Sequence, residues 1–523
     1  MKKLVHLSLF ISFILVMFTS CKEHEEQWQE PSKESPTVLA SYYIDTFCSN
    51  TSSDGTIVFS WKYVSEEFDY LNIVVNATDG SFSDEKTITD KNVTEYKITG
   101  VAGKIYSYSF TPYSSSGNIG KAFTGTRYVS AGEIEKALPT LVVTTKDYEW
   151  PDCDYVTHPE GSFGEGLTNN DYVMMNVVLY DADGTELYRT DDDYKSKIKI
   201  RGNTSAYGDK KPYKIKLDKK ADLLAPITGR TGKQYKDKEW LLMTNGTTLN
   251  NVIGFATNEY LGIEYTPEYA YVELIVNGDY RGIYMIVESV KQGNVDGENQ
   301  SRCQVEDDGY VFENDPYWWN EEVFFRTDRY HFQYTFKYPD TDDITKSQID
   351  YLKQYMDNFE TALAKNDNSY LDYIDVDSFV SWVLVHEYLG ANDGAGSNQY
   401  LMLRNSKPST KVEMTTTWDF DGIMNSKDDN KHANINRCGF FFSNKLLEKR
   451  SFHDLCSEKY EATKDGILDA INAKIDALNS VAIDVARQND AIRWRNSATS
   501  VASQKVAINT WINNRLAFLE REY

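Results

Sequence analysis

The segment HEYLGANDGAGSN, residues 386–398, is the most informative part of this chain of 523 residues. The spacing of apolar residues before it predicts a helix over 377–389, and Gly390 is a typical helix stop. The segment continues as a glycine-rich loop in which Asp393 and Asn398 lie five positions apart. The sequence thus predicts a carboxylate and an amide in one loop at the end of a helix.

Two further carboxylates follow this loop. The β-prone runs 399–404 and 411–417 predict a hairpin that leads to Trp418-Asp-Phe-Asp-Gly422. Protein kinases carry a catalytic Asp, a metal-binding Asn five residues later, and a second metal-binding Asp further along the chain. Oxygen ligands suit magnesium, and a carboxylate left free can accept a proton. The spacing therefore indicates a kinase-like site.

These residues also allow other interpretations. His386-Glu387 begins like the helix of a zinc protease, but position 390 is Gly, so the second histidine ligand is missing and we reject that interpretation. Asp393 and the neighbouring asparagines are types that fill turns for conformational reasons. The WDFD segment could likewise form a surface turn.

Upstream, two strand-like segments concentrate positive charge. Residues 197–201 and 210–217 alternate between polar and apolar types, as strands with one buried face do. One face is apolar, and the other collects the basic side chains Lys199, Arg201, Lys214 and Lys216. In a chain with a formal charge of −24, such a face suits phosphate binding. A solvated strand face is the alternative.

The segments that follow have the order of a kinase small lobe. Residues 247–261 predict a helix that carries Glu259. Residues 271–276 and 282–289 predict a hairpin whose second strand ends at Glu288-Ser289. In a kinase, the hinge after this hairpin contacts adenine through backbone groups.

Together, these blocks resemble the CotH family, the spore coat protein H kinases, over about residues 138–523. The blocks are RGNTS (201–205), KPYKIKL (211–217), GIYMIVE (282–288), residues 386–398 and WDFD (418–421). The resemblance implies an atypical protein-kinase-like fold that binds ATP and Mg2+ and phosphorylates Ser residues of proteins. By position, it implies Asp393 as the catalytic Asp, with Asn398 and Asp419 as metal ligands and Asp421 as a helper. It also implies that Arg201, with Lys214 or Lys216, binds the phosphates and that Glu259 pairs with one of these lysines. Glu288 and Ser289 would lie at the hinge.

The sequence departs from this pattern in two places. It has no G-x-G-x-x-G motif, although Gly161, Gly164 and Gly166 lie in a loop before the basic strands. Asn250-Asn251 stands where CotH proteins often carry an Arg-Asn pair, so one phosphate or structural contact is expected to be missing.

The first 37 residues are expected to target and tether the protein. A basic start, an apolar run of about 15 residues and Cys21 predict a bacterial lipoprotein signal over 1–20, with a lipid anchor at Cys21. An ordinary secretion signal is the alternative. Residues 21–37 are polar and read as a tether, and the acidic cluster at 23–26 resembles an outer-membrane export tag. We therefore expect a lipid-anchored, surface-exposed protein of the outer membrane.

The remaining chain is expected to form a multidomain protein. Short alternating runs and Trp61 predict an all-β sandwich over 38–129 that resembles a fibronectin type III domain. An α+β, bilobal kinase-like domain is expected to follow over 138–523, with a small lobe at about 138–290 and a large lobe at about 291–523. Helices are predicted over 345–364, 377–389, 465–486 and 500–521.

Charge and motifs together set the functional hypotheses. A net charge of −24 and an isoelectric point near 4.8 make nucleic-acid binding unfavourable. The leading hypothesis is a phosphotransferase with ATP or another nucleotide as partner. The alternative is a surface binding or adhesion lipoprotein with a weak or inactive kinase-like scaffold. A metal-dependent glycosidase or phosphatase would leave the basic strands unexplained.

Overall fold

The computed structural model describes residues 44–63, 68–114, 119–130, 136–162, 164–230, 236–293, 302–391, 398–425, 430–432 and 443–523. The predicted signal at 1–20, Cys21, the tether at 21–37 and Asp393 lie outside the described residues.

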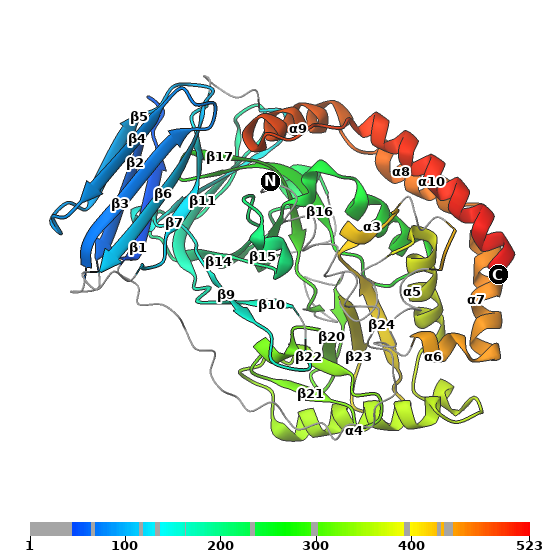
Figure 1. Cartoon of the computed structure of the whole chain (residues 1–523). Coiled ribbons are helices and arrows are strands. Elements are labelled where there is room, and N and C mark those ends of the chain that lie inside the picture. The colour runs from blue at the N-terminus through cyan, green and yellow to red at the C-terminus, as the bar shows by residue number, and fades with distance from the viewer. Residues whose placement is uncertain are drawn as a thin grey trace, which may run out of the picture. The chain divides into compact units, whose positions relative to one another are not determined.

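The N-terminal strands form a two-sheet sandwich, as the sequence predicts (Figure 1). One sheet has the order β1-β2-β5 and the other β4-β3-β6-β7. The strands are β1 (Ile44–Thr51), β2 (Thr56–Tyr63), β3 (Phe68–Ala77), β4 (Ser83–Ile88), β5 (Glu95–Thr99), β6 (Ile105–Ser114) and β7 (Phe123–Tyr128). Aromatic side chains dominate the space between the sheets, where Phe47, Phe59 and Phe110 pack together with Trp61. This three-plus-four arrangement resembles a fibronectin type III domain.

The next sheet closes into a barrel, which the sequence did not predict. Its order is β12-β11-β13-β14-β15-β17-β16-β8, and β8 also pairs with β11, so the ring closes. The strands are β8 (Thr140–Thr145), β11 (Val173–Tyr180), β12 (Glu186–Arg189), β13 (Ser196–Ile200), β14 (Tyr213–Ala221), β15 (Asp237–Met243), β16 (Tyr269–Val276) and β17 (Asp279–Glu288). Inward side chains such as Val177, Ile198 and Ile215 fill a separate apolar core.

A second, five-stranded sheet has the order β21-β22-β20-β23-β24. Its strands are β20 (Tyr310–Asn314), β21 (Phe324–Arg326), β22 (Gln333–Tyr338), β23 (Gln399–Leu403) and β24 (Val412–Thr417). The minor strands are β9 (Asp154–Thr157) and β10 (Glu165–Thr168), which form a hairpin, and β18 (Gln292–Gly293) and β19 (Cys303–Gln304). The hairpin predicted over 399–417 is confirmed as β23 and β24.

The helices largely follow the sequence pattern. They are α2 (Ala225–Thr228), α3 (Asn250–Tyr260), α4 (Lys346–Leu363), α5 (Val376–Leu389), α6 (Ser443–Leu447), α7 (Arg450–Thr463), α8 (Ile467–Asp476), α9 (Ser480–Trp494) and α10 (Val501–Glu522). Thr345 and Gln348 form a capping box at the start of α4, and Gly390 ends α5 in the left-handed conformation. The single helix predicted over 465–486 is wrong, because the chain breaks between α8 and α9, where Asn479 caps α9.

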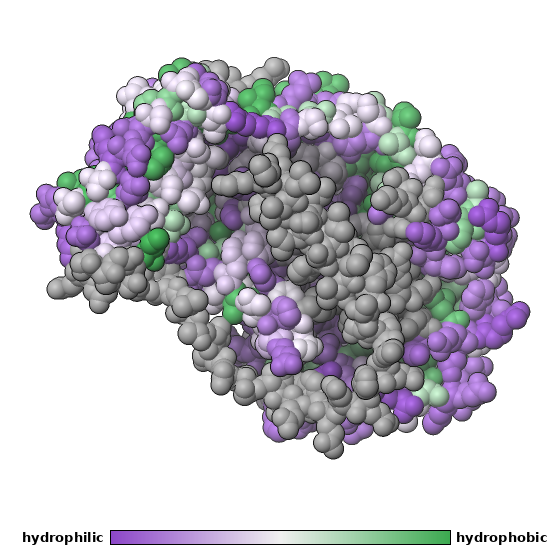
Figure 2. All heavy atoms as spheres, viewed as in Figure 1, coloured by the Kyte–Doolittle hydropathy of each residue, from purple (hydrophilic) through white to green (hydrophobic). Residues whose placement is uncertain are grey.

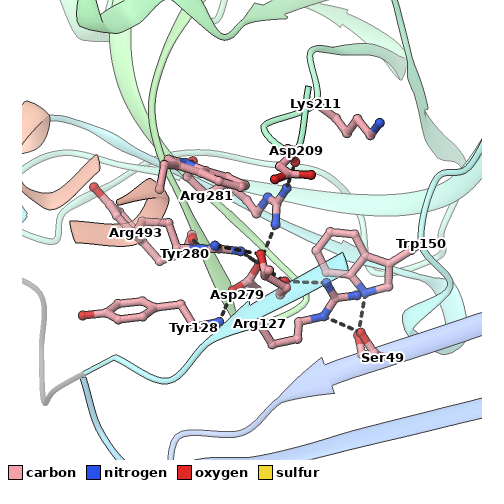
Figure 3. Close-up of polar contacts among 12 residues, drawn as sticks. Ser49, Arg127, Tyr128, Trp150, Asp209, Lys211, Asp279, Tyr280, Arg281 and Arg493 are labelled. Atoms are coloured by element: carbon pink, nitrogen blue, oxygen red, sulfur yellow. Dashed lines mark hydrogen bonds and ion pairs between the residues drawn. The ribbon is translucent and has the colours of Figure 1, made fainter. Parts of the chain in front are cut away.

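Buried charges join the sandwich to the barrel (Figure 3). Asp279 at the start of β17 is fully buried and accepts a hydrogen bond from Tyr128 N of β7 at 2.9 Å. The same carboxylate pairs with Arg281 at 2.8 Å and with Arg493 of α9 at 3.0 Å. Arg493 also donates to Thr126 of β7. The sandwich is therefore fixed to β17 and α9 by hydrogen bonds that neither part could satisfy alone.

Most of the described surface in Figure 2 is hydrophilic, with apolar residues scattered singly, as is normal for folded proteins. The exposed apolar side chains of the C-terminal helices are Val481, Ile492 and Val506. Within the described ranges, no helix is both long and apolar enough to cross a membrane.

Candidate active site

The predicted cationic face forms on the outside of the barrel. Lys197 lies opposite Lys216 and Lys199 opposite Lys214 in the antiparallel pair β13–β14, and all four side chains are partly exposed. The intervening Ile198 and Ile215 are fully buried in the barrel core. The strict alternation read from the sequence is confirmed.

Glu239 of β15 neutralises part of this face. Its carboxylate lies 3.0 Å from Lys214 Nζ and 3.5 Å from Lys216 Nζ. Burial raises the pKa of Glu239, but Lys214 and Lys291 more than offset this effect, so the pKa is lowered overall. Both lysines proposed for phosphate binding therefore already have a carboxylate partner.

Arg201, directly after β13, differs from the lysines. In the part of the chain that the structure describes, its side chain makes no hydrogen bond or ion pair. Burial lowers the pKa of the guanidinium, while the charges of Tyr400, Asp419 and Glu313 oppose this shift. These three groups belong to or follow strands of the second sheet. Arg201 therefore brings a positive charge with no ion-pair partner among the described residues into electrostatic range of Asp419.

Asn398 and Asp419 lie at the same end of the β23–β24 hairpin. Gln399 pairs with Thr417, so the residues just outside this pair are neighbours in space. Both Asn398 and Asp419 have left-handed backbones, with φ of 57° and 60°. Such conformations cost energy in residues other than glycine and cluster at functional sites.

The donor set at this hairpin end fits a divalent cation. It offers one amide and one carboxylate, the oxygen ligands that Mg2+ takes. Among the described residues, no group of three or more His, Cys, Asp or Glu side chains could hold a metal ion. Asp393, the other predicted carboxylate of the site, lies outside these residues.

Asp421 is exposed and is held at its place by α3 and the segment before it. Its Oδ1 accepts a hydrogen bond from Asn245 Nδ2 at 3.0 Å, and its backbone carbonyl accepts one from Asn250 Nδ2 at 3.4 Å. Asn250, which stands at the position where an Arg was expected, thus contacts the WDFD segment directly.

The prediction that Glu259 pairs with a lysine of the basic strands is wrong. Glu259 is exposed on α3, and its carboxylate pairs with Lys474 of α8 at 2.8 Å. The rotation of α3 about its axis is fixed by its apolar and amide residues, which turn Glu259 away from the barrel face. α3 instead contacts the WDFD segment through Asn251 and Phe255, and the end of β24 just before it through Asn258.

The side chain of Glu288, at the predicted hinge, is internal. It accepts a hydrogen bond from Glu268 N at 3.1 Å and lies 3.5 Å from Arg302 Nε. Burial raises the pKa of this carboxyl to about 7. At Ser289, the backbone carbonyl accepts a hydrogen bond from Tyr265 Oη at 3.4 Å. The role predicted for this hinge, contact with the nucleotide through backbone groups, stays a prediction.

Two of the three glycines before the basic strands are explained by close packing. Gly164 and Gly166 belong to the β9–β10 hairpin and its loop, and a Cβ atom at either position would collide with Tyr317 or Asn320. The loop between the basic strands themselves, residues 201–212, contains Gly202 with φ of 80°. This loop, rather than the earlier glycines, joins the two strands that carry the cationic face.

Glu387 holds the C-terminal helix in place, whereas His386 bonds within its own helix. Burial lowers the pKa of His386 to about 4, so the neutral ring donates through Nδ1 to Trp382 O at 2.8 Å. Glu387 is buried and pairs with Arg515 of α10 at 2.7 Å. The motif that begins like a zinc-protease helix thus anchors α10 on α5.

Sequence reasoning missed an acidic group on the second sheet. Glu313 of β20 lies opposite Tyr400 and pairs with Lys337 at 2.8 Å. Burial, with the charges of Asp315 and Glu321, raises the pKa of Glu313 to about 7 although Lys337 opposes the shift. No motif marks these residues, because only strand pairing brings them together.

Comparison with solved structures gives partial similarities at low sequence identity. The chain is similar to a two-domain fibronectin type III segment of chicken tenascin, with 15% identity, 33% of this chain and 89% of that chain covered, and a TM-score of 0.15. It is also similar to a twitchin kinase region from C. elegans, with 10% identity, 44% and 47% covered, and a TM-score of 0.18. At these TM-scores the fold assignment rests on the strand orders above.

No curated protein matches the chain. Residues 198–519 match the family described as CotH kinase protein, and this range contains most of β13, all of β14 and α3, and the β23–β24 hairpin. The match spans more than half of the 523 residues, so the chain belongs to the CotH kinase family.

Proposed function

We propose that this protein is an atypical protein kinase that transfers phosphate from ATP, with Mg2+, to a Ser hydroxyl of a protein. The observation that carries this proposal is the position of Arg201. It is a cation without a partner among the described residues, and it lies within electrostatic range of Asp419, a candidate metal ligand.

Each group of the site has a distinct role in this proposal. Asn398 and Asp419 would hold the metal ion, which supplies charge neutralisation on the nucleotide phosphates when bound. Arg201 and the loop 201–212 would contact the phosphates, because a guanidinium stabilises the charge of the transferred group. Asp393 would orient the substrate hydroxyl and accept its proton.

A thermal-shift titration tests nucleotide binding. ATP with Mg2+ should raise the melting temperature of the wild-type chain, since a ligand that binds only the folded state stabilises it by mass action. Asp419→Asn should abolish this shift. Asp350→Asn is the matched control, because Asp350 is an exposed residue of α4 paired only with Lys346 at the surface. The absence of any shift in the wild type would contradict the proposal.

Transfer of labelled phosphate then tests the chemistry. Asp393→Asn should lower transfer at least about a hundredfold and keep the nucleotide-dependent thermal shift, because general-base catalysis contributes about 10²–10⁴-fold. Nucleotide binding without transfer by the wild type would favour the alternative function, a surface binding protein with an inactive kinase-like scaffold.

A further inference from the structure

Helix α3 holds the strand before Asp419 through a fully buried amide. Asn258 Nδ2 donates to Thr417 O at 3.2 Å and to Thr416 Oγ1 at 3.3 Å. Thr417 Oγ1 in turn donates to Asn258 Oδ1. The amide therefore uses both of its ends on the last two residues of β24, two positions before Asp419.

A second amide of α3 holds the other side of Asp419. Asn251 lies seven residues before Asn258 and hence on the same face of the helix. Its Oδ1 accepts a hydrogen bond from Phe420 N at 3.4 Å, and its side chain is buried. Asn258 and Asn251 thus contact the residues on both sides of Trp418-Asp419.

Between Asn251 and Asn258, α3 packs closely against the WDFD segment. A Cβ atom at Gly254 would overlap the ring of Phe420, so only glycine allows this approach of helix and WDFD segment. Phe255 packs against Trp418 at 6.1 Å and edge-on against Phe420 at 5.8 Å, between ring centroids. The left-handed backbone of Asp419 persists because its neighbours are fixed on both sides.

We propose that Asn251, Gly254 and Asn258 are positioning residues that hold Asp419 in its metal-binding conformation. In protein kinases, an ion pair between a strand lysine and the Glu of the corresponding helix must be in place for activity. Here, Glu259 pairs with Lys474 instead, and buried amides connect the helix to the metal-binding segment. The metal-binding part of this inference rests on the proposed function.

The Thr417 hydroxyl offers a matched pair of variants in the full-length chain. Thr417→Val keeps the shape of the side chain but leaves Asn258 Oδ1 without its donor, whereas Thr417→Ser keeps the hydroxyl. Tb3+ luminescence sensitised by Trp418 reports metal binding beside Asp419 without any need for catalysis. We expect Thr417→Val to weaken Tb3+ binding at least about fivefold. Thr417→Ser and Glu259→Gln should remain within about twofold of the wild type.

Hydrogen exchange separates this inference from the proposed function. The Phe420 amide should exchange at least about tenfold faster in Thr417→Val and in Gly254→Ala than in the wild type or Thr417→Ser. Equal exchange in all four proteins, with cooperative melting retained, would overturn the inference. If Asp419→Asn leaves the Tb3+ signal unchanged, the proposed metal site fails, and the exchange rates alone decide whether α3 positions the segment.

Discussion

Arginine and aspartate side chains lie near each other in two regions of this molecule, but the two regions differ in whether ion pairs form among the described residues. At the junction of sandwich and barrel, Asp279 is surrounded by Arg281 and Arg493, and Arg127 contributes a further positive charge (Figure 3). At the candidate active site, Arg201 lies within electrostatic range of Asp419 but makes no ion pair among the described residues. The junction uses its charges to hold two folded parts together, whereas the candidate active site keeps a cation outside any ion pair among the described residues.

Burial explains why the junction arginines are not further candidates for phosphate binding. Arg127 is 3% exposed, donates to Ser49 Oγ, and lies with its guanidinium 3.9 Å from the Trp150 ring centroid. Arg493 similarly lies over Trp494 at 4.1 Å. Aromatic rings and internal hydrogen-bond acceptors thus compensate for the hydration that these guanidinium groups lose on burial. Counting arginines alone would not distinguish these positions from Arg201.

Removal of the Asp279 carboxylate should have the largest effect. Asp279→Ala leaves Arg281 and Arg493 buried without their common partner, so the free energy of unfolding should fall by about 3–5 kcal/mol. Urea unfolding followed by tryptophan fluorescence measures this loss. Asp350→Ala at the surface should change stability by less than about 0.5 kcal/mol. A comparably small loss for Asp279→Ala would mean that the junction charges do not hold the sandwich.

The second prediction compares the loss of Arg201 at the candidate active site with the loss of Arg127 at the junction. Arg201→Gln should weaken binding of ATP with Mg2+ by about 10-fold or more, since a hydrogen bond to a charged group contributes about 1.5–3 kcal/mol. Its melting temperature should stay within about 2 °C of the wild type, as expected for a side chain outside any ion pair. Arg127→Gln should do the reverse.

Calorimetric titration and melting curves of both variants test this contrast. The comparison fails if Arg201→Gln melts as early as Arg127→Gln, because Arg201 would then serve structure. It also fails if both variants bind the nucleotide as the wild type does.

Local sequence patterns predicted the elements that depend on near neighbours. The period of two in 197–201 and 210–217 gave β13 and β14 with the correct faces, because one-sided burial dictates alternation. The segment 386–422 predicted the end of α5 and the β23–β24 hairpin in the correct order. These features reflect side-chain spacing within a single element or hairpin.

Pairing between distant residues could not be predicted. Closure of the barrel depends on contacts between β8 and β11, and the junction depends on Arg493 reaching Asp279 from more than 200 residues away. Glu259 lies on the predicted helix, but its partner follows from the rotation of α3, which buried Asn258 and Gly254 determine. Composition gives no sign of such contacts, since Asn and Gly are also ordinary turn residues.

The smallest expected effect concerns pH, because the carboxyl pKa is lowered at the junction and raised near the candidate active site. Burial raises the pKa of Asp279, but Arg493, Arg281 and Arg127 more than offset this effect, so its pKa is lowered. The stabilising contribution of Asp279 is therefore lost only as the pH falls below the usual range of aspartate.

The pKa of Glu313 is raised to about 7, so this carboxyl is neutral at pH 6 and gains negative charge by pH 8. A nearby negative charge should weaken phosphate binding by about 0.5–1 kcal/mol. Wild-type affinity for ATP with Mg2+ should therefore fall about two- to fivefold more between pH 6 and 8 than the affinity of Glu313→Gln. The nucleotide itself titrates equally in both profiles, so its contribution cancels in the difference between them. Parallel profiles would show that Glu313 does not change charge in this range or does not act on the bound nucleotide.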